Sequence, residues 1–187
     1  MGPHYLNRFF TPKSVAIVGA SERIDSVGHR LLINMQEAGF KGGLYPVNNK
    51  HEQVLGLTAY PDLNAIPEDL DLVIIATPAT SVLNIIHQCG EKGVLSVIII
   101  SAGFGELGSE GKRLEQEILD YARRYNSGLP GLYMPYFISQ TDYNRDTSYN
   151  IDYGKKDHTC RSYFSQIKIH YIIQLIGLAN LRYAKRF

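Results

Sequence analysis

The sequence contains few cysteines and no long hydrophobic run, and both absences limit what the chain can be. Only Cys89 and Cys160 occur among 187 residues, and they are too far apart in the sequence to form a metal-binding motif. A reducing compartment is therefore favoured over a disulfide-rich secreted scaffold. No apolar run reaches the roughly 18 residues of a membrane-spanning helix, and residues 1–10 lack the apolar core of a signal peptide. We therefore expect a cytoplasmic protein with no membrane partner.

Motifs of several large enzyme classes are also missing. The chain has neither a G-x-x-x-x-G-K-[ST] phosphate loop nor a G-x-S-x-G nucleophile elbow. His29, His51 and His87 have no Cys, Asp or Glu partner at metal-ligand spacing. The formal net charge of +1 is ordinary for a globular domain. No catalytic residue, metal site or nucleic-acid partner is predicted.

Predicted strands and helices alternate between residues 14 and 126. Four short apolar runs rich in β-branched residues predict strands at 14–18, 44–47, 72–76 and 97–100. Apolar residues at helical spacing follow the first, third and fourth of these strands. This order is typical of a doubly wound α/β fold with a mostly parallel sheet and right-handed crossovers.

Prolines and hydroxyl residues refine this prediction. Pro46 inside the second strand indicates an end rather than a long central run. A brief helical turn is expected between Pro61 and Pro67. Thr80 or Ser81 is the expected N-cap of the helix that follows the third strand.

The loops that follow the predicted strands form the candidate site. Ligands of open parallel sheets bind beyond the carboxyl ends of the strands, where the strand order reverses. The loop from Gly19 to Ser26 leads from a strand into a helix, and backbone N–H groups at a helix N-terminus favour phosphate. The loops at 48–50, 77–79 and 101–105 follow the other strands. Together they predict a site for a nucleotide-like ligand.

The usual dinucleotide fingerprint, G-x-G-x-x-G followed by an acidic residue, is not present. Gly19-Ala20-Ser21 stands in its place, and the next glycine is Gly28. Lys50, rather than Asp or Glu, follows the second strand. A lysine there favours an additional phosphate on the adenosine ribose, as in coenzyme A or NADP. A solvated surface lysine is the alternative interpretation.

Several spaced motifs within residues 5–126 resemble the N-terminal coenzyme A-binding domain of NDP-forming acyl-CoA synthetases. The same domain opens related bacterial protein lysine acetyltransferases, in which a GNAT domain is fused to a synthetase-like region. The motifs, in chain order, are Leu6-Asn7-Arg8-Phe9-Phe10, Pro12-Lys13-Ser14-Val15-Ala16-Ile17-Val18-Gly19-Ala20-Ser21, Tyr45-Pro46-Val47-Asn48, Gly56, Tyr60-Pro61 with Leu63, Asp71-Leu72-Val73-Ile74-Ile75-Ala76-Thr77-Pro78 and Ser101-Ala102-Gly103-Phe104-Gly105-Glu106.

The resemblance implies a Rossmann-like coenzyme A-binding fold and a role for the first loop. Gly19, Ala20 and Ser21 would hold the diphosphate of coenzyme A through backbone N–H and hydroxyl contacts. Ser26 and Val27 would close the loop.

The resemblance also assigns roles to the other three loops. Lys50 would face the 3′-phosphate of the adenosine. Thr77 and Pro78 would line the nucleotide or the pantetheine arm. The path of that arm toward the reacting thioester would be bordered by Ser101, Gly103 and Phe104.

The composition changes abruptly after Asn126. Residues 127–187 hold eight of the thirteen tyrosines and no glutamate, and they carry eight Lys and Arg against four Asp. They also lack the Leu-Gly-Pro-Asn-Cys-x-Gly-like continuation of the family. We therefore expect a coenzyme A-binding domain at 1–126 and a tail without family resemblance at 127–187. A frameshift that truncates a longer protein and a lineage-specific extension both remain open as its origin.

Three functions follow from this sequence as expectations. The first is the coenzyme A-binding module of an ADP-forming acyl-CoA synthetase or of a synthetase-like acetyltransferase, which binds but does not turn over without the remaining subdomains or subunits. The second is an NADP-binding oxidoreductase. The third is a stand-alone regulatory protein that senses coenzyme A.

Overall fold

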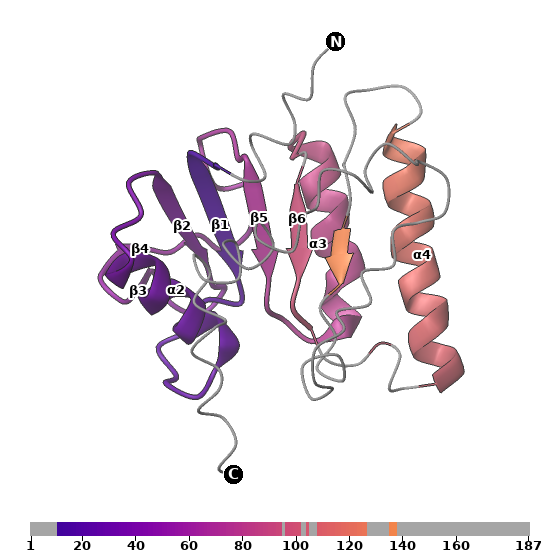
Figure 1. The fold of residues 1–187 in the computed structure, drawn as a ribbon, viewed down its shortest axis with the longest axis horizontal. Helices are drawn as coiled ribbons and strands as arrows, with labels where there is room; N and C mark the ends of the chain where they lie inside the picture. Colours follow the sequence, from indigo (N-terminus) through magenta and orange to yellow (C-terminus); the bar gives the residue numbers. More distant parts are fainter. Residues whose placement is uncertain (1–10, 95, 102–103, 105–107, 127–134, 138–187) are drawn as a thin grey trace.

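A computed structural model describes residues 11–94, 96–101, 104, 108–126 and 135–137. Its main sheet has five parallel strands in the order β2-β1-β5-β6-β7 (Figure 1). The strands are β1 (Ser14–Val18), β2 (Gly43–Val47), β5 (Leu72–Ile75), β6 (Val97–Ile99) and β7 (Pro135–Phe137). The helices are α2 (Val27–Glu37), α3 (Ala79–Glu91) and α4 (Gly108–Asn126). The predicted doubly wound α/β fold is confirmed.

The strand ends are aligned at one edge of the sheet. Val18 pairs with Val47 on one side and with Ile75 on the other, and Ile75 pairs with Ile99. Each of these residues is the last of its strand. The loops that follow the four strands therefore leave the sheet from one row, as the sequence predicted.

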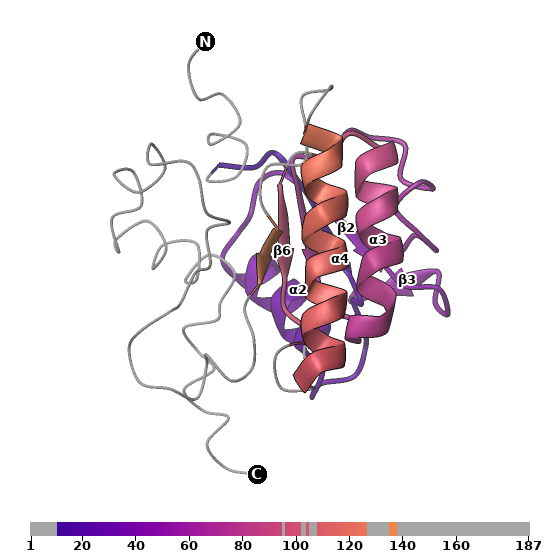
Figure 2. The ribbon, with the colours of Figure 1, turned by 90° about the vertical axis from the view of Figure 1, so that its right-hand side faces the viewer.

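The sheet separates two hydrophobic cores because successive side chains of a strand point to opposite faces. On one face, Val15 and Ile17 of β1 belong to the same core as Leu31 and Leu32 of α2. On the other face, α3 and α4 cover the sheet and lie side by side (Figure 2). The residues of that second core include Ala16, Val18, Val73, Ile75, Val82, Ile86, Val97, Ile99 and Ile118.

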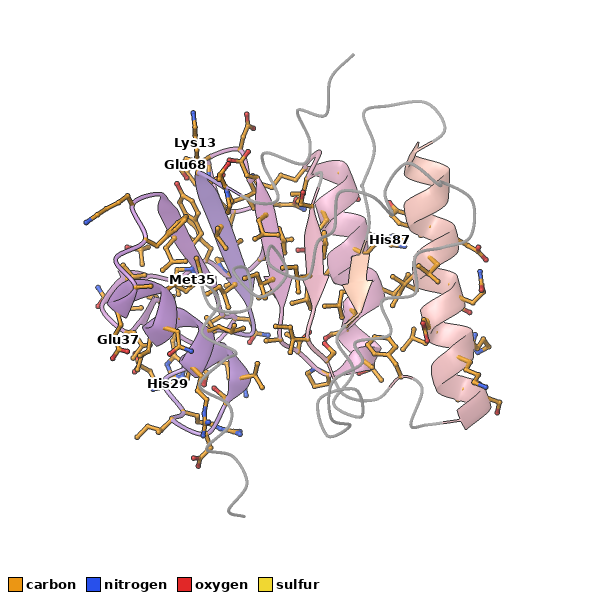
Figure 3. All side chains as sticks on the ribbon, in the orientation of Figure 1. Lys13, His29, Met35, Glu37, Glu68 and His87 are labelled. Carbon is orange, nitrogen blue, oxygen red and sulfur yellow. The ribbon has the colours of Figure 1, made fainter. Side chains whose placement is uncertain are left out.

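The two covering helices also meet through an aromatic pair. His87 of α3 stacks on Tyr121 of α4, with ring centroids 3.9 Å apart and an interplanar angle of 10°. Figure 3 shows His87 on the side of α3 that faces α4. His87 thus contributes to helix packing. None of the helices in the described ranges is long and apolar enough to span a membrane.

The structure corrects one local prediction. The N-cap of α3 is Pro78, without a side-chain hydrogen bond, so the prediction of Thr80 or Ser81 is wrong. The expected brief turn between Pro61 and Pro67 is a single hydrogen-bonded turn, in which Ile66 N–H donates to Leu63 O. β2 lies at the edge of the sheet, a position that accommodates its proline.

Two features were not predicted from the sequence. The strands β3 (Gln53–Val54) and β4 (Leu57–Thr58) form a small antiparallel hairpin. Its turn residues Leu55 and Gly56 have positive φ angles of 50° and 77°, as in the tight turns that close such hairpins. In addition, β7 extends the sheet beyond Asn126, the last residue of the predicted first domain. Residues 138–187 of the predicted tail lie outside the described residues.

Burial makes Cys89 an unreactive thiol. Its side chain is fully buried in the core between the sheet and α3, and burial raises the pKa of the thiol. Because reaction needs both an opening of the core and a thiolate, labelling of folded protein should be at least roughly a hundredfold slower than labelling in denaturant. A Cys160→Ser variant isolates Cys89, and the release of thionitrobenzoate from a disulfide reagent measures the rate. Rapid stoichiometric labelling of the folded variant would contradict the described core.

Candidate functional site

The candidate site lies at the carboxyl edge of the sheet, where the chain order reverses. The chain runs from β1 to β2 on one side and then crosses to β5 on the other side of β1. The loops after β1 and β5 therefore border the switch point, the usual ligand position in such sheets. Figure 3 labels Lys13 just before the amino end of β1 and His29 near the opposite, carboxyl edge.

Glycine is required at the end of β1 because two other segments approach it closely. Gly19 has a φ of +91°, and a Cβ built on it would lie 2.5 Å from the carbonyl oxygen of Ala76, just after β5. A Cβ on Gly28, in the first turn of α2, would lie 1.9 Å from the carbonyl oxygen of Gly19. The end of β1, the start of α2 and the residue after β5 are thus in direct contact.

Two side chains hold successive carbonyl groups of the β1–α2 loop, residues 19–26. The amide Nδ2 of Asn48, just after β2, donates to Ala20 O at 2.7 Å. The ring Nδ1 of His29 lies 3.0 Å from Ser21 O. Because a carbonyl oxygen only accepts, this contact places a proton on Nδ1 of His29.

This arrangement orients two N–H groups away from the protein partners. In a trans peptide the C=O and the following N–H point in opposite directions, and the described chain has no cis peptide bond. The N–H groups of Ser21 and Glu22 therefore point away from Asn48 and His29. Neither N–H donates a hydrogen bond to any described residue. Both are placed near the N-terminus of α2, where an anion is favoured.

In the structure, Gly19 and Ser26 make hydrogen bonds within the protein that the sequence did not predict. The N–H of Gly19 donates to Val47 O at 3.1 Å and is therefore already paired. The glycine is needed for the close backbone contacts of the loop, and its N–H is not free for a ligand. The Ser26 hydroxyl donates to Arg23 O and accepts from His29 N–H as the N-cap of α2. Val27, the first residue of α2, is partly exposed.

The loop after β2 is ordered by the same Asn48 side chain. Its Oδ1 accepts the N–H of Lys50 at 2.8 Å and the N–H of His51 at 3.1 Å. This is the local side-chain-to-backbone turn that asparagine favours. The Lys50 side chain extends from this turn into solvent. The structure thus places Lys50 on a loop that is tied to the β1–α2 loop.

The loop after β5 carries Thr77 and Pro78. Thr77 is half-buried, and its methyl group contacts the position that a Cβ of Gly19 would occupy. Its Oγ1 lies 2.8 Å from the Ser81 hydroxyl, in the first turn of α3. Pro78 is exposed at the start of that helix. Both residues therefore border the switch point.

The loop after β6 contributes a buried hydroxyl that has no partner among the described residues. The side chain of Ser101 is 5% exposed, and its Oγ is the one buried side-chain N or O atom of the described residues that makes no hydrogen bond. Such a group costs about 1–3 kcal/mol unless a partner binds it. Phe104 is 3% exposed and belongs to the core beneath α3 and α4. Gly103 lies outside the described residues.

Sequence reasoning did not single out three residues that shape the site, although Glu22 and Asn48 lie within the predicted site loops. Asn48 and His29 hold the carbonyl groups of the β1–α2 loop, and Glu22 Oε1 accepts the N–H of Leu55 in the β3–β4 turn at 2.7 Å. Asparagine directly after a strand was the available signal for Asn48. The other two contacts depend on the tertiary approach of distant segments. Among the described residues, no group of three or more His, Cys, Asp or Glu could hold a metal ion.

Comparison with known proteins gives a consistent result. Residues 13–132 match the family model described as a CoA binding domain. The chain is 40% identical over 130 residues to the alpha subunit of acetate–CoA ligase [ADP-forming] I of Pyrococcus furiosus, an alignment that covers 67% of this chain and 28% of the relative. It is 42% identical over 126 residues to acetate–CoA ligase [ADP-forming] I of Archaeoglobus fulgidus, covering 67% of this chain and 18% of that relative.

A solved structure supports the same relationship. The dinucleotide-forming acetyl-coenzyme A synthetase 1 of Ca. Korarchaeum cryptofilum, in complex with phosphate and ADP, superposes with a TM-score of 0.62 at 33% identity. The match covers 71% of this chain and 26% of that chain. The chain thus spans less than a third of the length of these relatives.

Replacing Gly28 with alanine tests the contact between the β1–α2 loop and α2. The added methyl group would overlap the carbonyl oxygen of Gly19, so the free energy of unfolding should fall by about 1–3 kcal/mol although alanine favours helix. Arg30→Ala, at an exposed position of the same helix, should stay within about 0.5 kcal/mol of wild type. Urea denaturation measures both. Equal stability of the two variants would contradict the close contact.

Proposed function

Since the chain belongs to the family of CoA-binding domains, we propose that it is the coenzyme A-binding module of an ADP-forming acyl-CoA synthetase. Coenzyme A would bind across the carboxyl edge of the sheet, in contact with the loops after β1, β2, β5 and β6. The observation that carries this proposal is the pair of N–H groups of Ser21 and Glu22 in the loop that precedes α2, which point away from Asn48 and His29 and donate to no described residue. These donors suit a diphosphate.

The loops after β2, β5 and β6 offer groups that would contact the rest of coenzyme A. Lys50 offers a cation for the 3′-phosphate at the end of the neighbouring strand. Thr77 and Pro78 border the switch point between the loops. The unpartnered Ser101 hydroxyl would hydrogen-bond a polar group of the pantetheine arm, because a buried hydroxyl gains from any donor or acceptor that reaches it.

The proposal makes this chain a binding module within a larger catalyst. The relatives described above are named as acetate–CoA ligases, and this chain aligns with less than a third of each. The chemistry that joins the acyl group to coenzyme A would therefore reside in further subdomains or subunits, which are the expected partners of this domain. These ligase names favour a synthetase as parent over an acetyltransferase. No feature of the site favours NADP over coenzyme A.

Binding of three ligands tests this proposal. Isothermal titration calorimetry of the full chain should show coenzyme A binding more tightly than both dephospho-coenzyme A and NADP. Lys50→Ala should weaken coenzyme A binding by about 1–3 kcal/mol, the range for a charge-assisted hydrogen bond, and should leave dephospho-coenzyme A nearly unaffected.

Lys41 provides a matched control for the charge. It is an exposed lysine that precedes the amino end of β2, at the opposite edge of the sheet from Lys50. Lys41→Ala should bind coenzyme A as wild type does. The proposed function fails if coenzyme A binds no better than NADP, and the assignment of Lys50 fails if the two lysine variants behave alike.

A further inference from the structure

Every polar group of Asn48 except its backbone carbonyl oxygen takes part in a hydrogen bond with a described residue. Its N–H donates to Tyr60 O at 2.8 Å, which attaches it to the segment after β4. Its Nδ2 donates to Ala20 O, and its Oδ1 accepts the N–H groups of Lys50 and His51. The half-buried side chain of Asn48 thus joins its own loop to the β1–α2 loop, and its backbone N–H adds the segment after β4.

The two ends of this side-chain amide bind the two loops that are proposed to hold the phosphates of coenzyme A. The Nδ2 end fixes the Ala20 carbonyl, and thereby the direction of the Ser21 N–H. The Oδ1 end fixes the backbone from which the Lys50 side chain extends. Because an amide group is planar and rigid, its two ends hold the backbone of Lys50 at a set position relative to the Ser21 N–H.

We propose that Asn48 is a positioning residue that couples the diphosphate-binding loop to Lys50, and that it determines the preference for coenzyme A over dephospho-coenzyme A. This inference rests on the proposed function. Coenzyme A carries its diphosphate and its 3′-phosphate on one ribose, at a separation that varies little. Both can be bound at full strength only where the protein keeps their two binding groups at a matching separation.

Calorimetry with coenzyme A and dephospho-coenzyme A on the full chain separates the two ends of the amide. Wild type should prefer coenzyme A by roughly tenfold or more. Asn48→Ala removes both contacts, so coenzyme A affinity should fall by roughly tenfold or more and the preference should drop below about threefold, although Lys50 is intact.

Asn48→Ser breaks the tie between the two loops, and His29→Phe is the matched control. A serine hydroxyl accepts the N–H two residues later but is too short to reach Ala20 O, so the Lys50 turn is kept while its link to the β1–α2 loop is lost. The preference for coenzyme A should therefore drop toward that of Asn48→Ala. His29→Phe removes the contact with Ser21 O and touches no residue of the Lys50 loop. It should weaken both ligands equally and keep the preference.

The outcomes distinguish this inference from the proposed function. If Asn48→Ala keeps the wild-type preference while Lys50→Ala loses it, the coupling is overturned and the proposed function stands. If wild type binds both ligands alike, the assignment of Lys50 fails first. If Asn48→Ala shows no folded state in a thermal melt, Asn48→Ser decides: a clear loss of the preference for coenzyme A supports the coupling, and a wild-type preference overturns it.

Discussion

The site depends on the absence of a side chain at the end of β1. Gly19 and Gly28 let the backbone of β1, the first turn of α2 and the residue after β5 meet at distances that a Cβ would prevent. Because these segments meet there, the N-terminus of α2 lies directly beside the switch point of the sheet. The β1–α2 loop then has little freedom of its own, and its peptide groups are directed by the neighbouring elements.

The orientation of its peptide groups, more than its amino-acid composition, makes this loop a candidate phosphate site. The carbonyl groups of Ala20 and Ser21 are bound by Asn48 and His29, and the N–H groups of the same peptide units face the other way. Glu22 is bound by the β3–β4 turn through Leu55 N–H. A site whose donors are already oriented loses less entropy on binding than a flexible loop would. Packing on both faces of the sheet and ligand binding at its edge are therefore connected through a few backbone contacts.

Much of this could be read from the sequence because it is encoded locally. The apolar runs of β1, β5 and β6 and the start of α2 after the loop that ends at Ser26 depend on short-range pattern and side-chain chemistry, and their predictions were confirmed. The start of α3 was misplaced because Pro78 precedes the helix without a side-chain cap. The β3–β4 hairpin was missed because strands of two residues show no periodicity. The contacts of Asn48 and His29 with the β1–α2 loop join segments brought together only by the fold, and the position of Asn48 directly after a strand was the one local signal for either of them.

In the proposed complex the N–H groups of Ser21 and Glu22 receive the diphosphate of coenzyme A, while the N–H of Gly19 remains bound to Val47 O. Titration of the ¹⁵N-labelled chain with coenzyme A, followed by two-dimensional ¹H–¹⁵N NMR, measures this directly. Binding in this way should give large amide shifts at Ser21 and Glu22, with a much smaller shift at Gly19. Shifts confined to α3 and α4, or a large shift at Gly19 with none at Ser21 and Glu22, would contradict it.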